Sequence, residues 1–224
     1  MIILLYAVMI VISGILAVLA AEYQECYIKE QELSFKHIKL NFFSRPLQFI
    51  VFLILYLLFT GLAIFFYQKK NLNPVQLPQY VIFWECLLAG AWIDFKVKKI
   101  PNVVFLLLLG VRTIGIMIEI AYYPEALFQI LLDAFSGLLT GGLITMVCRL
   151  ISRGGLGAGD VKLFALTGYY FGIIPTMNIL FYTTFLSAVF AGFLLISKKA
   201  KMKSTLALGP FVFIGLNIYY ILLS

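Results

Sequence analysis

Two aspartates stand out because of the residues that surround them. Asp94 ends an apolar segment and is followed by three lysines and then by Pro101, whose φ angle already suits a helix start. Asp160 follows four glycines within six residues and opens another apolar segment. Glycines let a backbone or a peptide come close. Two carboxylates held this way could share proton transfer, one taking a proton from water and the other polarising a carbonyl.

Such a pair would hold one proton between its members, because two close carboxylates cannot both ionise cheaply. The chemistry needs neither a metal nor another cofactor. The chain has one histidine, His37, and three scattered cysteines, Cys26, Cys86 and Cys148, so no zinc or disulfide framework is indicated. No GxxxxGK[ST] loop for a nucleotide is present.

Plainer interpretations of both aspartates stay open. Asp94 could be the i,i+4 partner of Lys98 on a helix surface, with the lysines marking only the side of a membrane. Asp160 could cap the helix that follows a flexible turn.

The other acidic residues are interpreted structurally. Glu85 and Asp133 lie within apolar segments; we expect Glu85 to pair with Arg112 in the next segment, and Asp133 to lie protonated against Ser136 and Gly137. An alternative is an ion or solute transporter whose path is lined by Glu85, Arg112 and Asp133. Six acidic residues are expected in hydrated loops or at segment ends: Glu22, Glu25, Glu30, Glu32, Glu119 and Glu125.

Composition predicts an all-α, polytopic membrane protein. Apolar residues make up 63% of the 224 residues and charged residues only 12%, about half the share in soluble domains. Apolar runs approach the roughly 20 residues needed to cross a bilayer. About eight transmembrane helices are expected: 2–21, 46–67, 79–94, 103–122, 127–148, 162–174, 177–197 and 206–223. The first is expected to be a retained anchor, and the short sixth either to cross obliquely or to pair tightly with the seventh.

The distribution of positive charge predicts that both termini lie outside. With the N-terminus out, fourteen of the seventeen lysines and arginines fall in inner segments. The basic residues alternate with apolar runs, so we read them as topology signals and expect no nucleic acid partner. The chain is expected to be one integral membrane domain, 1–224, whose polar segment 22–45 is a short cytoplasmic loop.

At these residues the sequence resembles the prepilin leader peptidases, which are GxGD aspartic proteases. Asp94 is followed by Ile100-Pro101-Asn102, and Gly157-Ala158-Gly159-Asp160-Val161-Lys162-Leu163 matches the GxGDxKL motif. Gly209-Pro210-Phe211 supplies a third element. The resemblance covers about residues 80–215.

The resemblance implies a multi-pass protein of the inner (plasma) membrane that cleaves pilin-like precursors on the cytoplasmic side. Such precursors carry a basic leader and an apolar helix. Asp94 and Asp160 would be catalytic, and the residues expected to bind substrate are Gly157, Gly159, Lys162, Pro101 and Asn102. Lys162 is expected to point away from Asp160, toward lipid head groups or an acidic substrate residue.

One departure from the family concerns the segment 22–45. Bifunctional members carry paired CxxC motifs there and also methylate the product, whereas this segment holds only Cys26. We therefore do not expect N-methyltransferase activity. A GxGD peptidase with another substrate, such as a preflagellin-type enzyme, is the nearest alternative.

Overall fold

The structure is a computed structural model that describes residues 46–69, 75–152, 155–198 and 206–223. Within these ranges every regular element is a helix and no strand occurs. The elements are α3 (Pro46–Lys69), α4 (Leu77–Val97), α5 (Asn102–Tyr122), the 3₁₀ turn η1 (Pro124–Ala126), α6 (Leu127–Ile151), α7 (Ala158–Phe171), α8 (Ile173–Ile196) and α9 (Gly209–Leu223). The expected anchor at 2–21 and the loop at 22–45 lie outside the described residues.

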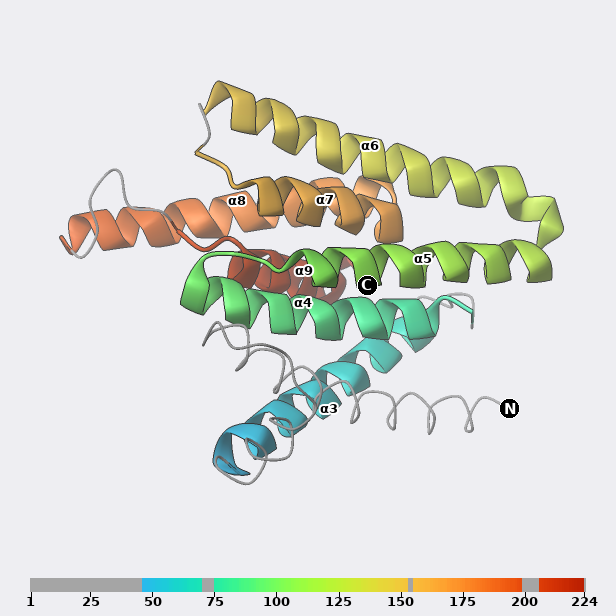
Figure 1. The fold of residues 1–224 in the computed structure, drawn as a ribbon, viewed down its shortest axis with the longest axis horizontal. Coiled ribbons are helices and arrows are strands. Elements are labelled where there is room, and N and C mark those ends of the chain that lie inside the picture. Colours follow the sequence, from blue (N-terminus) through green and yellow to red (C-terminus); the bar gives the residue numbers. More distant parts are fainter. Residues whose placement is uncertain (1–45, 70–74, 153–154, 199–205, 224) are drawn as a thin grey trace.

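The helix α4 is the centre of the bundle. It contacts α3, α5 and α9, and Figure 1 shows α4 and α5 running side by side while α3 crosses them obliquely. Trp84 of α4 donates its indole N–H to the Asn217 amide oxygen of α9 at 3.3 Å. Phe83 of α4 lies against Tyr170 of α7, with ring centroids 4.6 Å apart. These contacts fix α4 against α7 and α9, which matters because α4 carries Asp94.

Glycines bring α6 and α7 into backbone contact. A Cβ added to Gly168 would collide with the carbonyl of Gly137, and one added to Gly141 would collide with the carbonyl of Phe164. The helices can approach this closely only because no side chains separate them, as in other membrane helix pairs with small residues at the interface. The short sixth segment therefore pairs most closely with α6, not with the segment that follows it.

Substituting Gly168 should loosen this pair. We expect Gly168→Ala to lower the free energy of unfolding by about 1–3 kcal/mol, because the added methyl group forces the two backbones apart. Gly192 of α8 is the matched control, since a Cβ there meets no atom within 4 Å. Thermal unfolding of both purified variants measures the difference. Equal midpoints for Gly168→Ala and Gly192→Ala would contradict the close packing.

A glycine also separates α7 from α8. Gly172 has φ +79°, a value that L side chains rarely adopt, and its N–H donates to the carbonyl of Gly168 at 2.8 Å. The sequence placed this break too late, at Pro175, which instead lies inside the first turn of α8.

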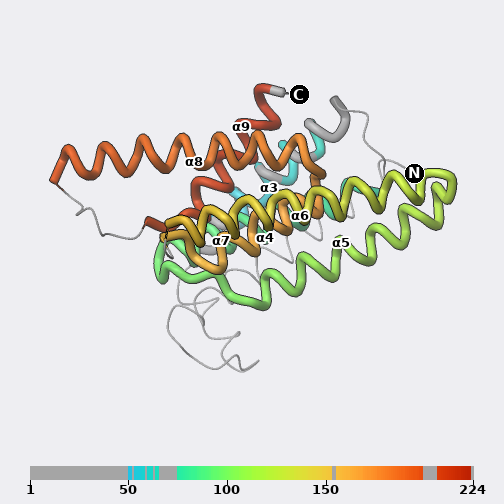
Figure 2. Tube along the Cα trace, turned by 90° about the horizontal axis from the view of Figure 1, so that it is seen from above, coloured from blue at the N-terminus to red at the C-terminus, as the bar shows by residue number. Residues whose placement is uncertain are grey.

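Three of the described helices are long and apolar enough to cross a membrane: Asn102–Tyr122, Pro124–Ile151 and Ile173–Ile196. Shorter apolar helices occur at Leu53–Leu62 and Gly209–Leu222. Large apolar side chains cover the outward faces of these elements, as Phe181, Phe185 and Phe193 do on α8. Figure 2 shows α5 and α6 as a long hairpin that extends past the rest of the bundle, while α8 extends in the opposite direction. Such apolar exteriors suit contact with lipid.

Candidate active site

Asp94 lies in the last turn of α4, at the left-hand end of this helix in Figure 1. The chain leaves the helix at Lys98, whose φ is +55° and whose N–H donates to the Asp94 carbonyl at 2.7 Å. Pro101, with φ −63°, then directs the chain into α5, which begins at Asn102. The reversal places the end of α4 beside the start of α5.

Asp160 is held at the start of α7. The Gly157 N–H donates to its Oδ2 at 3.0 Å, which is the bond that an acidic residue at the third helical position makes to the residue before the helix. The interpretation of Asp160 as a capping residue is thus confirmed in its essentials. The same bond fixes the direction of the carboxylate, so the capping role and a chemical role are compatible.

The structure brings the two aspartates to one cavity. It measures about 520 Å³ and lies where α4 ends and where α5 and α7 begin. Its walls contain both carboxylates and include Lys98, Lys99, Ile100, Asn102, Phe105, Gly155, Gly157, Ala158, Gly159, Lys162, Leu206 and Leu208. A volume of this size is typical of small-molecule and cofactor sites.

The start of α9 supplies the partner of Asp94. The Gly209 N–H donates to Asp94 Oδ2 at 2.8 Å, and the Asp94 side chain is 95% buried, with 5% exposed. A Cβ on Gly209 would lie only 3.0 Å from this oxygen and 3.2 Å from the Cα of Ala91. Glycine at this position therefore lets the backbone approach α4 closely enough to orient the carboxylate.

Burial and a second negative charge act on Asp160, which lies outside the three candidate spans. Burial, followed by the charge of Asp94, raises the pKa of Asp160 from 3.8 to about 6. The Gly157 N–H and Arg149 oppose this shift but do not cancel it. The charge of Asp94 acts on Asp160 because both residues line the same cavity.

The residues expected to bind substrate are placed differently from one another. Gly157, Gly159, Asn102 and Lys162 line the cavity, whereas Pro101 is buried and does not. Lys162 lines the same cavity as Asp160. Its ammonium group donates to Asn102 Oδ1 at 2.9 Å, which joins the starts of α5 and α7.

Sequence reasoning missed several parts of this site. Lys99, Phe105, Leu206 and Leu208 line the cavity, and Lys162 lies 5.7 Å from the centre of the Phe105 ring. The Gly209-Pro210-Phe211 element drew attention to the start of α9. The sequence did not show that the Gly209 N–H donates a hydrogen bond to Asp94. Among the described residues no cluster of His, Cys, Asp and Glu could hold a metal ion.

The expectations for the other charged residues need correction. Arg112 pairs with Glu119 at 2.7 Å and not with Glu85. Glu85 instead accepts a hydrogen bond from Thr60 of α3 at 2.9 Å. Glu119 is only 1% exposed, so hydration does not account for it. Of the three residues in the transporter alternative, Arg112 and Asp133 line a second cavity, and Glu85 is not among its lining residues.

The side chain of Asp133 is exposed on α6 and is not packed against small residues as expected. Only its backbone carbonyl is used locally, as the acceptor of a long bond of 3.4 Å from the Ser136 hydroxyl. The position of Asp133 in the second cavity is described below.

Part of the chain is similar to proteins of a known family. Residues 80–196, just over half of the chain, match the type IV leader peptidase family. A prepilin leader peptidase/N-methyltransferase of Bacillus subtilis (strain 168) is 28% identical over 161 residues, which cover 64% of this chain and 65% of that protein. The alignment thus spans less than two thirds of the relative. No solved structure shows significant similarity to the chain.

The matched region contains both aspartates, the reversal between α4 and α5, and the glycine-rich start of α7. It ends before Gly209, whose N–H reaches Asp94 from outside the matched residues. The chain belongs to the type IV leader peptidase family.

Proposed function

We propose that this chain is a membrane aspartic endopeptidase that removes the leader from pilin-like precursors, with Asp94 and Asp160 as its catalytic residues. The observation that carries the proposal is that these two carboxylates, 66 positions apart in the sequence, line one cavity. Membership in a leader peptidase family supports the choice of substrate. The name of the similar Bacillus subtilis protein, prepilin leader peptidase/N-methyltransferase, points to the same kind of substrate.

The proposed reaction divides two proton transfers between the carboxylates. The ionised carboxylate takes a proton from a water molecule, and the water oxygen forms a bond to the scissile carbonyl carbon. The protonated carboxylate gives its proton to the carbonyl oxygen, which produces a neutral tetrahedral diol. The carboxyl group that took the water proton then gives it to the amide nitrogen, and the other carboxylate takes a proton from one diol hydroxyl. The C–N bond breaks, and one acid and one amine are released.

In this proposal Asp160 holds the shared proton. The pKa of Asp160 is raised to about 6, so this group is the acid in the proposal. Asp94, which accepts the Gly209 N–H, is then the base. Both assignments belong to the proposal and concern the enzyme before substrate binds.

The substrate would lie along the membrane boundary. Its apolar helix would rest among apolar helix faces of the bundle, and the peptide at the cleavage point would extend over Gly157 and Gly159. We place this cavity on the cytoplasmic side of the plasma membrane, with both termini outside and about eight spans. The acidic residues suggested as a surface for the basic leader, Glu25, Glu30 and Glu32, lie outside the described residues.

The direct test is cleavage by the purified protein. In detergent micelles it should cut a pilin-like precursor at one bond between the basic leader and the apolar helix, as read by mass spectrometry of both products. A precursor whose apolar helix is kept but whose leader is removed is the matched control. Failure to cut any such precursor, by protein that is folded, would overturn the proposed function.

The pH dependence of this cleavage follows from Asp160. As pH rises through about 6, the proton is lost and both carboxylates become ionised, so the pair has no acid. We expect kcat/KM to fall by about tenfold for each pH unit above this value. Rates measured across this range test the sign, and a kcat/KM that rises through pH 6 would contradict a shared proton.

A further inference from the structure

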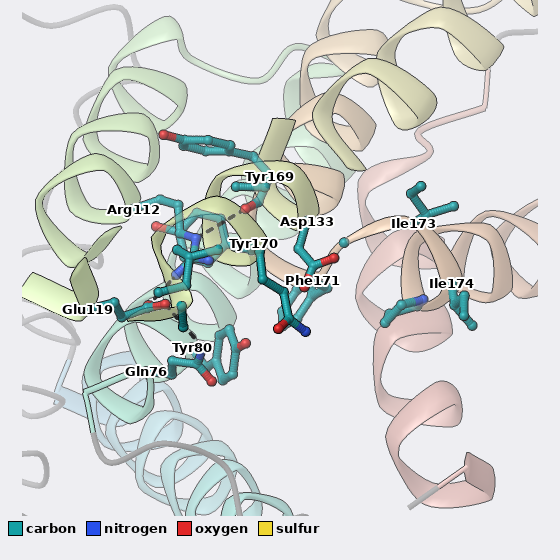
Figure 3. Close-up of a pocket in the computed structure, with 16 residues that line it drawn as sticks. Gln76, Tyr80, Arg112, Glu119, Asp133, Tyr169, Tyr170, Phe171, Ile173 and Ile174 are labelled. Atoms are coloured by element: carbon teal, nitrogen blue, oxygen red, sulfur yellow. Dashed lines mark hydrogen bonds and ion pairs between the residues drawn. The ribbon is translucent and has the colours of Figure 1, made fainter. Parts of the chain in front are cut away.

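A second cavity, of about 560 Å³, lies at the opposite end of the bundle from the aspartate pair. Tyr80 lines it and Asp94 lines the other cavity, and these residues are fourteen apart on α4, which corresponds to about 21 Å. Figure 3 shows side chains of α4, α5, α6 and α7 around this space, among them Tyr80, Arg112, Asp133 and Phe171. The proposed peptidase reaction uses none of them.

The buried ion pair in its wall is already satisfied. Arg112 donates to Glu119 Oε1 at 2.7 Å, to the Tyr169 carbonyl at 3.1 Å and to the amide oxygen of Gln79. Glu119 also accepts bonds from Gln79 at 2.8 Å and from Gln76 at 3.2 Å. The two charges cancel, and Arg112 points its donors at protein acceptors. The pair therefore gives the cavity no attraction for an anion.

One further charge lines the cavity, and it is negative. Asp133 of α6 is exposed toward this space, and its carboxylate makes no hydrogen bond or ion pair with any residue in the described ranges. Aromatic residues line much of the remaining wall: Tyr80, Tyr169, Tyr170 and Phe171. The Tyr170 ring already faces the Arg112 guanidinium, 5.9 Å from the ring centre, so a ligand would meet chiefly Tyr80 and Phe171. A carboxylate beside aromatic faces is the combination that binds organic ammonium groups, through a charged hydrogen bond and cation–π contact.

The depth of Asp133 favours a cationic partner. The spanning element Pro124–Ile151 has 28 residues, or about 42 Å, so a hydrocarbon core of about 30 Å centred on it begins about 6 Å from its start. Asp133 lies about 14 Å from that start, within the core, where ionisable side chains are costly and pair with other charged groups. Apolar residues such as Ile173 and Ile174 lie at one side of the cavity and could contact an acyl chain.

We propose that this cavity binds a primary ammonium group, with Asp133 as its anionic partner and the Tyr80 and Phe171 rings as the cation–π surface. The ammonium comes from the head group of a zwitterionic lipid such as phosphatidylethanolamine or from a soluble amine. The site does not depend on the peptidase proposal, because it shares no residue with the aspartate cavity.

Lipid binding by the purified full chain tests the site. The protein in dodecyl maltoside micelles is titrated with dioctanoyl phosphatidylethanolamine, with dioctanoyl phosphatidylglycerol and with free ethanolamine, and bound molecules are counted by native mass spectrometry. We expect the ethanolamine lipid to bind at least about tenfold more tightly than the glycerol lipid, and Asp133→Asn to remove this preference. Glu125→Gln is the matched control, because Glu125 is exposed at the same end but does not line the cavity.

Competition between the lipid and free ethanolamine distinguishes a lipid head-group site from a site for soluble amines. Displacement of the lipid by free ethanolamine assigns a site for soluble amines, and resistance to displacement assigns a lipid head-group site. Since the Asp133 carboxylate makes no bond that folding depends on, Asp133→Asn should unfold at the wild-type temperature. Equal binding of the two lipids, or a preference that survives in Asp133→Asn, would overturn the proposal, as would the absence of binding by lipid and ethanolamine alike.

Discussion

Asp94→Asn and Asp160→Asn are each expected to reduce cleavage of a pilin-like precursor by about a hundredfold to ten-thousandfold. General acid–base catalysis by one positioned side chain contributes about this much to a rate. An amide at either position can neither take a proton from water nor return one to the leaving nitrogen. The two losses should not add in the double variant, because each change alone removes the proton-sharing pair. The measurement is kcat/KM with the purified proteins.

The structure separates this loss of rate from a loss of folding. The amide oxygen of asparagine can still accept the Gly209 N–H at position 94 and the Gly157 N–H at position 160. Because the folded state raises the pKa of Asp160 from 3.8 to about 6, the ionised group lowers stability as pH rises through this range. Asp160→Asn should therefore be at least as stable as wild type at neutral pH. Glu125→Gln provides an exposed acid-to-amide control, and full activity in either aspartate variant would remove that residue from the proposed catalytic pair.

Removing the carboxylate of Glu119 is expected to cost about 3–5 kcal/mol of stability, the range measured when one partner of a buried ion pair is lost. Arg112, which is only 4% exposed, would keep its charge without an anionic partner. The amides of Gln76 and Gln79 would each lose one acceptor. Thermal unfolding of Glu119→Ala in detergent, compared with Glu125→Gln, measures this effect.

A double variant identifies the cause. Arg112→Met combined with Glu119→Leu removes both charges while keeping apolar volume, so it should be more stable than Glu119→Ala alone. The expected pattern is a large loss for the single change and a smaller loss for the pair. If the double variant is less stable by the sum of the two single losses, the ion pair is not the source of the effect.

Much of the helical architecture could be predicted because helix ends coincide with charged, proline and glycine residues. The reversal at Lys98 to Pro101 and the start of α7 at the glycine-rich segment are examples. The pairing of α6 with α7 could not be predicted, since it depends on Gly137 and Gly168 meeting across two helices. A glycine in the sequence indicates that another element could approach the helix closely there. It does not indicate which element, because tertiary packing decides that.

The candidate site was predictable in its two carboxylates and less so in its surroundings. Local motifs single out Asp94 and Asp160, but the Gly209 N–H that orients Asp94 comes from 115 residues away. The Arg112–Glu119 pair had a signal that was overlooked. These residues are seven apart, about two helical turns, and therefore share a face of α5. Because Glu119 lies near the end of an apolar segment, the sequence analysis expected it to be hydrated.

The brevity of α7 has a consequence for how the protein meets an electric field. Its fourteen residues reach about 21 Å, roughly 9 Å less than the hydrocarbon core of a bilayer. Asp160 at its start borders one cavity and Phe171 at its end borders the other. Water in both cavities would thin the insulating layer between them to about the length of α7, so a transmembrane voltage would fall more steeply there than through the surrounding lipid. Proton movement at Asp160 would then sense membrane voltage as well as pH.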